Sequence, residues 1–383
     1  VFLFCLALFS LSSWLCAVSP NIYWLIAFRF LQAVGGGGLV PSIYGLAGDY
    51  FLEERARVIG MFTSIYSLGS IIGPTIGGWL LVSWSWRSVF WFNLPIGLLA
   101  LVAAGILLQN DQAFQRTRLD LPGAALFSGF LFAIIFFMTR LGQDPSGLYS
   151  WKNWLLPALA VVFLAAFLQH ESRETNPIIE MSLLKSRVFA VLNILNLVYG
   201  ACVFAISTFI PYFAQTVYGF SSLAGGTLLT GQALGMMGMA FVTSMLLKRT
   251  GYRIPMALGF LFLSLSTLGL GWYLRHTALF GWEIPSYGFL MSMSLISGIG
   301  NGLTSPSSNN AAIELMPEKI SAISGLRGMF RQAGGIIGVA GVVLTLSRFT
   351  DPAAGFQVVF IGMGLLLLVS LPLIREVPEP KPQ

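Results

Sequence analysis

The sequence predicts an all-α polytopic membrane protein, and three observations lead to this prediction. Hydrophobic residues make up 56% of the 383-residue chain and charged residues 9%, with a mean hydropathy of +0.80. Apolar segments long enough to cross a bilayer recur along the whole chain. Basic residues gather in alternate connecting segments. So much apolar surface cannot be buried inside a water-soluble domain, in which about 25% of residues would be charged.

Twelve apolar segments are predicted to be membrane-spanning helices, because each has about the 20 residues that one crossing needs. They cover residues 1–18, 22–48, 58–82, 88–108, 121–139, 153–169, 188–213, 222–247, 254–274, 284–310, 320–347 and 354–374. If successive helices alternate in direction, thirteen Lys and Arg residues fall in the links on one side and five in the links on the other. The basic side, which includes the C-terminus, is therefore predicted to be cytoplasmic.

An internal repeat relates two parts of the chain at an offset of 265 residues. The stretch GSIIGPTIG at 69–77 returns as GGIIGVAGV at 334–342, and the same offset aligns Pro41 with Pro306. Both copies run in the same predicted membrane direction. The two halves are therefore expected to be related by an axis along the membrane normal.

The repeat predicts the domain organisation. Residues 1–109 correspond to the last four helices of a six-helix half, and residues 188–375 to a complete second half. Residues 110–187 hold an inserted helix pair and a cytoplasmic linker, and residues 376–383 form a cytoplasmic tail. The first half would begin about 77 residues before Val1. We therefore expect fourteen helices in the intact protein, of which twelve are present and the first two are missing.

Arg29 lies inside the apolar run LIAFRFLQAVGGGGLVP at 25–41. Placing a guanidinium in the membrane interior costs free energy, so an arginine at this position indicates a function. Arginine cannot release a proton at accessible pH. Its expected role is to stabilise the charged form of a nearby carboxylate, with Gln32 completing the hydrogen-bond network. No acidic residue falls in the interior of a predicted span, so this carboxylate is expected on a missing helix or on the substrate. The repeat partner of Arg29 is Ser294, which indicates that the charge is not needed for the helix fold.

The segment GSIIGPTIGGWL at 69–80 places Gly69, Gly73 and Gly77 four residues apart on one helix face. Pro74 and Gly78 lie beside them. Small residues at this spacing let another helix approach closely, and the proline bends the helix. Two interpretations stay open at this point. One is simple helix packing, and the other is a contact surface that rearranges during a transport cycle.

The pattern G-x-x-x-G-P-x-x-G-G resembles the antiporter signature of the major facilitator superfamily. RFLQAVGGG at 29–37 resembles that superfamily's R-x-x-Q-G-x-G motif, with Ala33 in place of the more usual glycine. SWRSVFWFNLPIG at 85–97 is similar to the segment that opens the sixth helix in the fourteen-helix drug:proton antiporter family of the EmrB/QacA type. The resemblance covers essentially the whole chain. It implies the major facilitator fold, a bacterial cytoplasmic (inner) membrane location, and proton coupling through Arg29 and Gln32.

The link LLKRTGYRIP at 246–255 resembles a degenerate copy of the superfamily's D-R-x-G-R-R loop motif, with Lys248 in place of the acidic residue. A basic cytoplasmic turn that only follows the positive-inside rule is the alternative interpretation. We expect Glu314 to pair with Arg249 or Arg253 when the transporter faces outward. Asp49, the repeat partner of Glu314, would have lost its own partner with the missing segment. The predicted cytoplasmic gate thus comprises Asp49, Lys248, Arg249, Gly251, Arg253 and Glu314.

Polar residues on two helices of the second half are candidates for a substrate cavity, namely Asn193, Asn196, Tyr199 and Arg331. Hydrogen bonding between helices explains the first three equally well. Arg327, one turn before Arg331, is expected to snorkel to the cytoplasmic surface. The two histidines and three cysteines are isolated in the sequence, so neither a metal site nor a disulfide is predicted.

These features and the resemblance predict proton-coupled efflux of small amphipathic molecules by alternating access. The expected partners are the substrate, protons and the lipid bilayer, with a periplasmic adaptor protein in a Gram-negative cell, and no cofactor. A proton-coupled importer or a facilitator of the same superfamily is the alternative. An enzyme is not expected, because the sequence has no metal cluster, no nucleophile with a neighbouring base and no phosphate loop. A transport-inactive sensor or assembly subunit is a further alternative. The basic residues are scattered through the loops, so they do not predict nucleic-acid binding.

Overall fold

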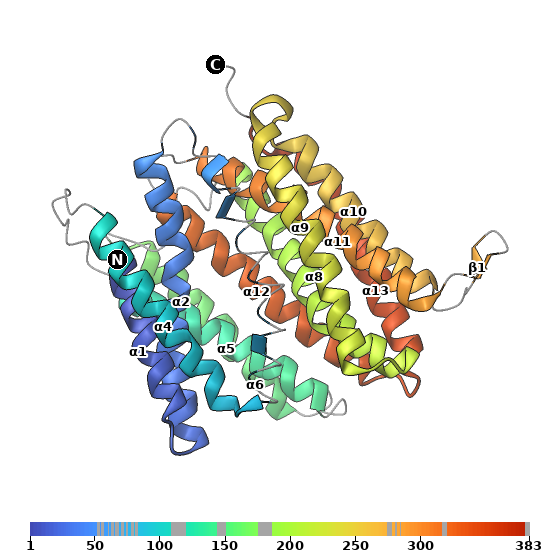
Figure 1. Cartoon of the computed structure of the whole chain (residues 1–383), viewed down its shortest axis with the longest axis horizontal. Helices are drawn as coiled ribbons and strands as arrows, with labels where there is room; N and C mark the ends of the chain where they lie inside the picture. Colours follow the sequence, from blue (N-terminus) through green and yellow to red (C-terminus); the bar gives the residue numbers. More distant parts are fainter. Residues whose placement is uncertain are drawn as a thin grey trace. The chain divides into compact units, whose positions relative to one another are not determined.

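In the computed structural model, the residues that the structure describes are almost entirely helical (Figure 1). It describes residues 1–51, 54, 57–59, 61–62, 65, 69, 73, 76–77, 80, 83–108, 120–143, 151–174, 186–273, 278–279, 282–283, 285–315 and 320–379. Contacts divide the chain into two compact units. The first contains residues 1–55, 69–116 and 318–325, and the second contains residues 56–68, 117–317 and 326–383.

The first unit is built around helices α1 (Phe2–Ala17), α2 (Ile22–Tyr50) and α4 (Trp86–Leu107). Helix α1 packs against both α2 and α4. The crossing of α1 and α2 is close at Gly35, where a Cβ atom would lie 2.6 Å from the backbone nitrogen of Phe9. The glycine run that follows Arg29 therefore serves helix packing at this position.

The second unit holds the other helices and one small ribbon. Its helices are α5 (Leu121–Gln143), α6 (Trp151–Glu171), α8 (Arg187–Tyr218), α9 (Ser222–Thr250), α10 (Arg253–Tyr273), α11 (Ser286–Ile313), α12 (Ile320–Leu346, from Leu326 onward in this unit), α13 (Pro352–Ser370) and the 3-10 helix η2 (Leu371–Glu376). Strands β1 (Ala278–Leu279) and β2 (Trp282–Glu283) pair antiparallel in the link between α10 and α11.

Eleven of the twelve predicted membrane segments coincide with a helix. The exception, 58–82, lies largely outside the described residues. Among the residues that the structure describes, nine helices are long and apolar enough to cross a membrane. Helix α1 is shorter than these, and α11 is more polar because serine and asparagine recur along it.

The inserted pair of helices, α5 and α6, forms a hairpin that packs on α8 and α12. The rings of Phe127 on α5 and Phe167 on α6 lie 5.2 Å apart between centroids. Both are buried in one apolar cluster with Phe189 and Leu326. The predicted boundaries of the inserted segment, at 110 and 187, stay predictions.

Helix α11 is buried along most of its length and packs against α9 and α10 (Figure 1). A Cβ atom at Gly298 would lie 2.0 Å from the carbonyl oxygen of Gln232 on α9. A Cβ atom at Gly302 would lie 2.7 Å from the carbonyl oxygen of Met236. The two backbones approach so closely that the crossing requires glycine at these positions of α11.

We predict that Gly298→Ala destabilises the protein by about 1–3 kcal/mol, because the added methyl group must displace the backbone of α9. The measurement is thermal unfolding of the purified protein, followed by tryptophan fluorescence. Gly288→Ala is the matched control on the same helix, since no described atom lies within 4 Å of its Cβ position. This control should keep or slightly raise the Tm. Equal Tm values for the two variants would contradict the close crossing.

Candidate functional site

Arg327 on α12 is a buried cation of the second unit, with 4% of its surface exposed. Its Nη1 donates to Asn309 Oδ1 (2.6 Å) and its Nη2 donates to Ser308 Oγ (2.5 Å), both on α11. Nη2 also lies 3.5 Å from Asn196 Oδ1 on α8, and Asn196 Nδ2 donates back to the carbonyl oxygen of Arg327 (2.5 Å). We call these four residues the Arg327 network. They join α8, α11 and α12.

The expectation that Arg327 snorkels to the cytoplasmic surface is wrong. Its guanidinium is held inside the helix bundle by neutral oxygen atoms from two other helices. A buried charge in a membrane protein persists when such partners replace the water that it has lost. The sequence gives no spacing that would have revealed these partners, because Asn196 lies 131 residues before Arg327.

Asn193, Asn196 and Tyr199 are buried on α8, with 3–4% of each residue exposed. The Tyr199 hydroxyl donates to Asn301 Oδ1 on α11. Asn193 Nδ2 donates to the carbonyl oxygen of Phe189 within its own helix (2.9 Å). The structure thus places Asn196 and Tyr199 in contacts between helices, which is the alternative that the sequence left open. Their part in a substrate cavity stays a prediction.

Arg331 is half-buried one turn beyond Arg327, where α12 crosses α8. A Cβ atom at Gly200 would lie 2.1 Å from the carbonyl oxygen of Arg331. Cβ atoms at Gly334 and Gly338 would lie 2.0 Å and 2.3 Å from carbonyl oxygens of α8. The second copy of the repeat therefore packs α12 tightly against α8.

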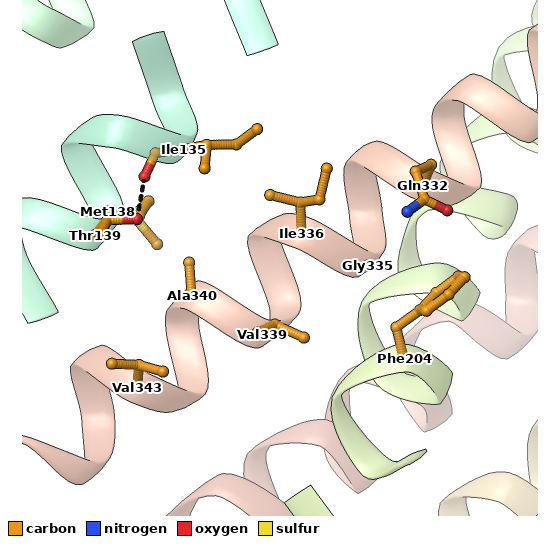
Figure 2. Close-up of a pocket in the computed structure, with 10 residues that line it drawn as sticks. All are labelled: Ile135, Met138, Thr139, Phe204, Gln332, Gly335, Ile336, Val339, Ala340 and Val343. Carbon is orange, nitrogen blue, oxygen red and sulfur yellow. Dashed lines mark hydrogen bonds between the residues drawn. The ribbon is translucent and has the colours of Figure 1, made fainter. Parts of the chain in front are cut away.

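An apolar cavity of about 400 Å³ lies beside this crossing, between α5, α8 and α12 (Figure 2). It is lined by Ile135, Met138, Thr139, Phe204, Gln332, Gly335, Ile336, Val339, Ala340 and Val343. The amide of Gln332 lies at one end of the cavity and the hydroxyl of Thr139 at the other (Figure 2). This size and lining suit the apolar part of a small molecule. The cavity does not include the four residues that the sequence proposed for a substrate site.

In the first unit, the two predicted proton-coupling residues are joined on α2. Arg29 Nη1 donates to Gln32 Oε1 (2.7 Å), and Gln32 Nε2 donates to Ser13 Oγ on α1 (2.6 Å). The guanidinium carbon of Arg29 lies 5.7 Å from the centre of the Phe90 ring on α4. Gln32 is buried, whereas the side chain of Arg29 is exposed among the described residues. A buried amide thus orients a cation that a further group can approach, and its coupling role stays a prediction.

The antiporter motif is described in part. Gly69, Gly73 and Gly77 have helical backbone, and no described atom lies within 4 Å of a Cβ atom at any of them. Pro74 and Gly78 lie outside the described residues. The role of this motif as a moving contact surface stays a prediction.

The predicted cytoplasmic gate has other partners in this structure. Arg253 Nε donates to the carbonyl oxygen of Val377 (2.7 Å) and lies 3.7 Å from Glu379 Oε1. Glu314 Oε2 accepts a hydrogen bond from the Tyr252 hydroxyl (3.0 Å). The predicted pairing of Glu314 with Arg249 or Arg253 concerns an outward-facing state and stays a prediction.

Three of the remaining gate residues lie around the turn that ends α9. Lys248 and Arg249 stand in the last turn of this helix. Gly251 follows with φ of 70°, a left-handed conformation that favours glycine over residues with a side chain. The side chain of Asp49 lies outside what the structure describes.

A polar cluster at the start of α5 and the end of α6 is absent from the sequence prediction. Asp120 Oδ1 accepts the N–H of Gly123 (2.8 Å) and lies 2.7 Å from His170 Nε2, and Glu174 Oε2 lies 3.9 Å from the same nitrogen. Burial raises the pKa of Asp120, but the Gly123 N–H and His170 outweigh it and hold the pKa below its ordinary value. Ligand atoms of Asp120, His170 and Glu174 lie within 4.8 Å of one another, as metal ligands do. Asp120 and His170 are 50 residues apart, so the sequence alone does not indicate that they form a cluster.

Comparisons with known proteins agree on one family. The family model of the Major Facilitator Superfamily matches residues 1–339. Multidrug transporter protein MdtP of Bacillus subtilis (strain 168) is 31% identical over 344 residues, which are 87% of this chain and 60% of the relative. Multidrug resistance protein B homolog of Mycobacterium tuberculosis (strain ATCC 25618 / H37Rv) is 32% identical over 337 residues, 87% and 61% of the two chains. This chain spans about three fifths of the length of these relatives.

A solved structure supports the same fold. The human organic anion transporter MFSD10 (TETRAN) superposes with a TM-score of 0.66 at 17% identity, and covers 97% of this chain and 76% of its own. At this identity the likeness concerns the fold alone.

We predict that Asn196→Ala lowers the free energy of unfolding by about 1–3 kcal/mol, because it removes an acceptor and a donor from the buried Arg327 network. Asn193→Ala is the matched control, since Asn193 is equally buried on the same helix and its amide donates within that helix. Equilibrium unfolding in detergent micelles measures both variants. A loss for Asn193→Ala that equals the loss for Asn196→Ala would contradict the special role of the network.

Proposed function

Because the chain belongs to the Major Facilitator Superfamily, we propose that it forms part of a secondary transporter that exports small amphipathic molecules in exchange for protons. The observation that carries this proposal is the match of 87% of the chain to proteins named as a multidrug transporter and a multidrug resistance protein. The apolar cavity between α5, α8 and α12 is consistent with amphipathic substrates, because it offers an apolar lining with an amide at one end. The antiporter motif at Gly69–Gly77 favours exchange over import.

Proton coupling requires a group that changes protonation within the membrane. Arg29 keeps its charge, so we propose that it stabilises the charged form of a carboxylate that belongs to the substrate or to a segment beyond the described residues. The bond from Gln32 orients the guanidinium for this purpose. When substrate or a conformational change displaces the carboxylate, the carboxylate takes up a proton.

Alternating access requires a gate that closes on the cytoplasmic side. We propose that Glu314 exchanges Tyr252 for Arg249 or Arg253 in the outward-facing state. The present contact of Glu314 supports this proposal, because a cation binds a carboxylate more strongly than the neutral Tyr252 hydroxyl does. Arg253 would leave Glu379 in the same step.

The proposed location is the bacterial cytoplasmic membrane with the C-terminus in the cytoplasm, as the distribution of basic residues indicates. The fourteen-helix EmrB/QacA type, with a periplasmic adaptor in Gram-negative cells, belongs to the same proposal. A proton-coupled importer or a facilitator of the superfamily is the alternative.

The proposed exchange predicts that a transported drug dissipates the pH gradient in everted membrane vesicles from pump-deficient cells that express the full-length protein. Acridine-orange fluorescence measures the gradient, and a panel of amphipathic compounds supplies the substrate. A facilitator would move the compounds without changing the gradient. An importer that moves drug and proton in the same direction would instead accumulate the compounds in intact cells. Either of these two results would contradict the proposal.

In the same assay, Arg29→Gln should move the pH profile of exchange to higher pH, because a carboxylate without its cation holds its proton at higher pH. Arg29→Lys should shift the profile less. Arg87→Gln is the control, since Arg87 stands at the start of α4 and donates to the carbonyl oxygen of Ser19. A pH profile that stays the same in Arg29→Gln would exclude Arg29 from proton coupling.

A further inference from the structure

A second apolar groove, of about 370 Å³, lies between α10 and η2 and shares no lining residue with the first cavity. It is lined by Ile254, Ala257, Leu258, Leu261, Leu371 and Ile374. The first four of these residues recur at helical spacing and form one face of α10. Ile254, Leu258 and Leu261 are 59%, 43% and 47% exposed, so this face has no cover among the described residues.

This face of α10 points away from the helix that α10 packs against most extensively. Gly259 and Ser266 of α10 contact α11, and at 3.6 residues per turn both lie about 120–160° around the helix from Ile254 and Leu261. The groove therefore opens to the outside of this group of helices. In a membrane that outside is lipid, and a groove lined by carbon atoms is filled by acyl chains rather than by water.

Two arginines stand at one end of the groove. Arg253 is the first residue of α10, and Arg375 lies in the last turn of η2. Arg253 is held through Nε by Val377, and its terminal NH₂ groups make no hydrogen bond to a described residue. Arg375 is exposed, with no hydrogen bond or ion pair to any residue that the structure describes.

The acidic residues near this rim already have partners, and Glu379 Oε1 lies 3.7 Å from Arg253 Nε. Glu379 accepts the backbone N–H groups of Tyr252 (2.9 Å) and Arg253 (3.3 Å), where α10 begins. Glu376 is paired with Arg187 (2.8 Å). Donors of Arg253 and Arg375 thus remain available to an anion that approaches the end of the groove.

We propose that this groove binds an anionic phospholipid. One acyl chain lies along the face of α10 from Ile254 to Leu261, and the phosphate lies between Arg253 and Arg375. The charge of the rim and the apolar lining match the two parts of such a lipid, as basic pockets between membrane helices do in general. The positive-inside distribution, on which the proposed orientation rests, places this lipid in the cytoplasmic leaflet.

The test uses the purified full-length protein in nanodiscs that contain a trace of phosphatidylglycerol or phosphatidylcholine with the same photoactivatable acyl chain. Cross-linked peptides are mapped by mass spectrometry. We expect phosphatidylglycerol to label the peptide that contains residues 254–261 more strongly than phosphatidylcholine does. Arg375→Gln should lower this preference about fivefold, and Arg253→Gln combined with Arg375→Gln should abolish it.

Two further variants separate the groove from general lipid contact. Leu258→Trp fills the groove and should prevent labelling there, whereas Leu365→Trp, at an exposed position of α13, should not. Arg249→Gln controls for the loss of a cytoplasmic charge outside the groove and should leave the labelling unchanged. Equal labelling by the two lipids, or labelling that is insensitive to Arg375→Gln, would overturn the proposal. The lipid preference does not depend on drug export, so its failure and the failure of the proposed function are distinguishable.

Discussion

The packing of α8, α11 and α12 in the second unit depends on one buried cation. A guanidinium inside a membrane protein must find its hydrogen-bond partners within the protein. Arg327 meets this requirement with oxygen atoms from α8 and α11, so three helices are fixed by one side chain. Other polar contacts join α8 and α11 to α9. Gln232 on α9 lies 3.0 Å from Ser207 on α8 and 3.4 Å from Ser297 on α11. The polarity that makes α11 a poor membrane span by composition therefore provides its contacts inside the unit.

These polar contacts require the helices to approach one another closely, and glycine residues at the crossings allow this approach. At Gly298 on α11 and at Gly334 on α12 a side chain would collide with the backbone of the neighbouring helix. The repeat in the sequence marks such positions, because Gly334 and Gly338 belong to its second copy. The charge of Arg29, however, has no counterpart there. Its repeat partner Ser294 is fully buried on α11, so the proposed coupling chemistry of Arg29 is not repeated there.

The length and hydrophobicity of the apolar segments were sufficient to place eleven of the predicted helices, because both are local properties of a membrane span. The partners of Arg327 could not be found in this way. Whether an arginine near a helix end turns to the surface or to the interior depends on the neighbours of that helix, and these come from α8 and α11. The contacts of Asp120 with His170, and the groove that ends at Arg253 and Arg375, are hidden for the same reason. The proton-coupling role of Arg29 and Gln32 came from the family resemblance, and the structure adds the bond that joins them.

The central claim is that Arg327 and its oxygen partners act together to hold α8, α11 and α12. A double-mutant cycle with Arg327→Gln and Asn309→Ala tests it most directly, with the free energy of unfolding measured in bicelles. We expect a coupling free energy of about 1 kcal/mol or more between the two changes. Arg327→Gln combined with Ser292→Ala, at an exposed position of α11, should be additive. Additivity within about 0.3 kcal/mol for Arg327 and Asn309 would contradict the account.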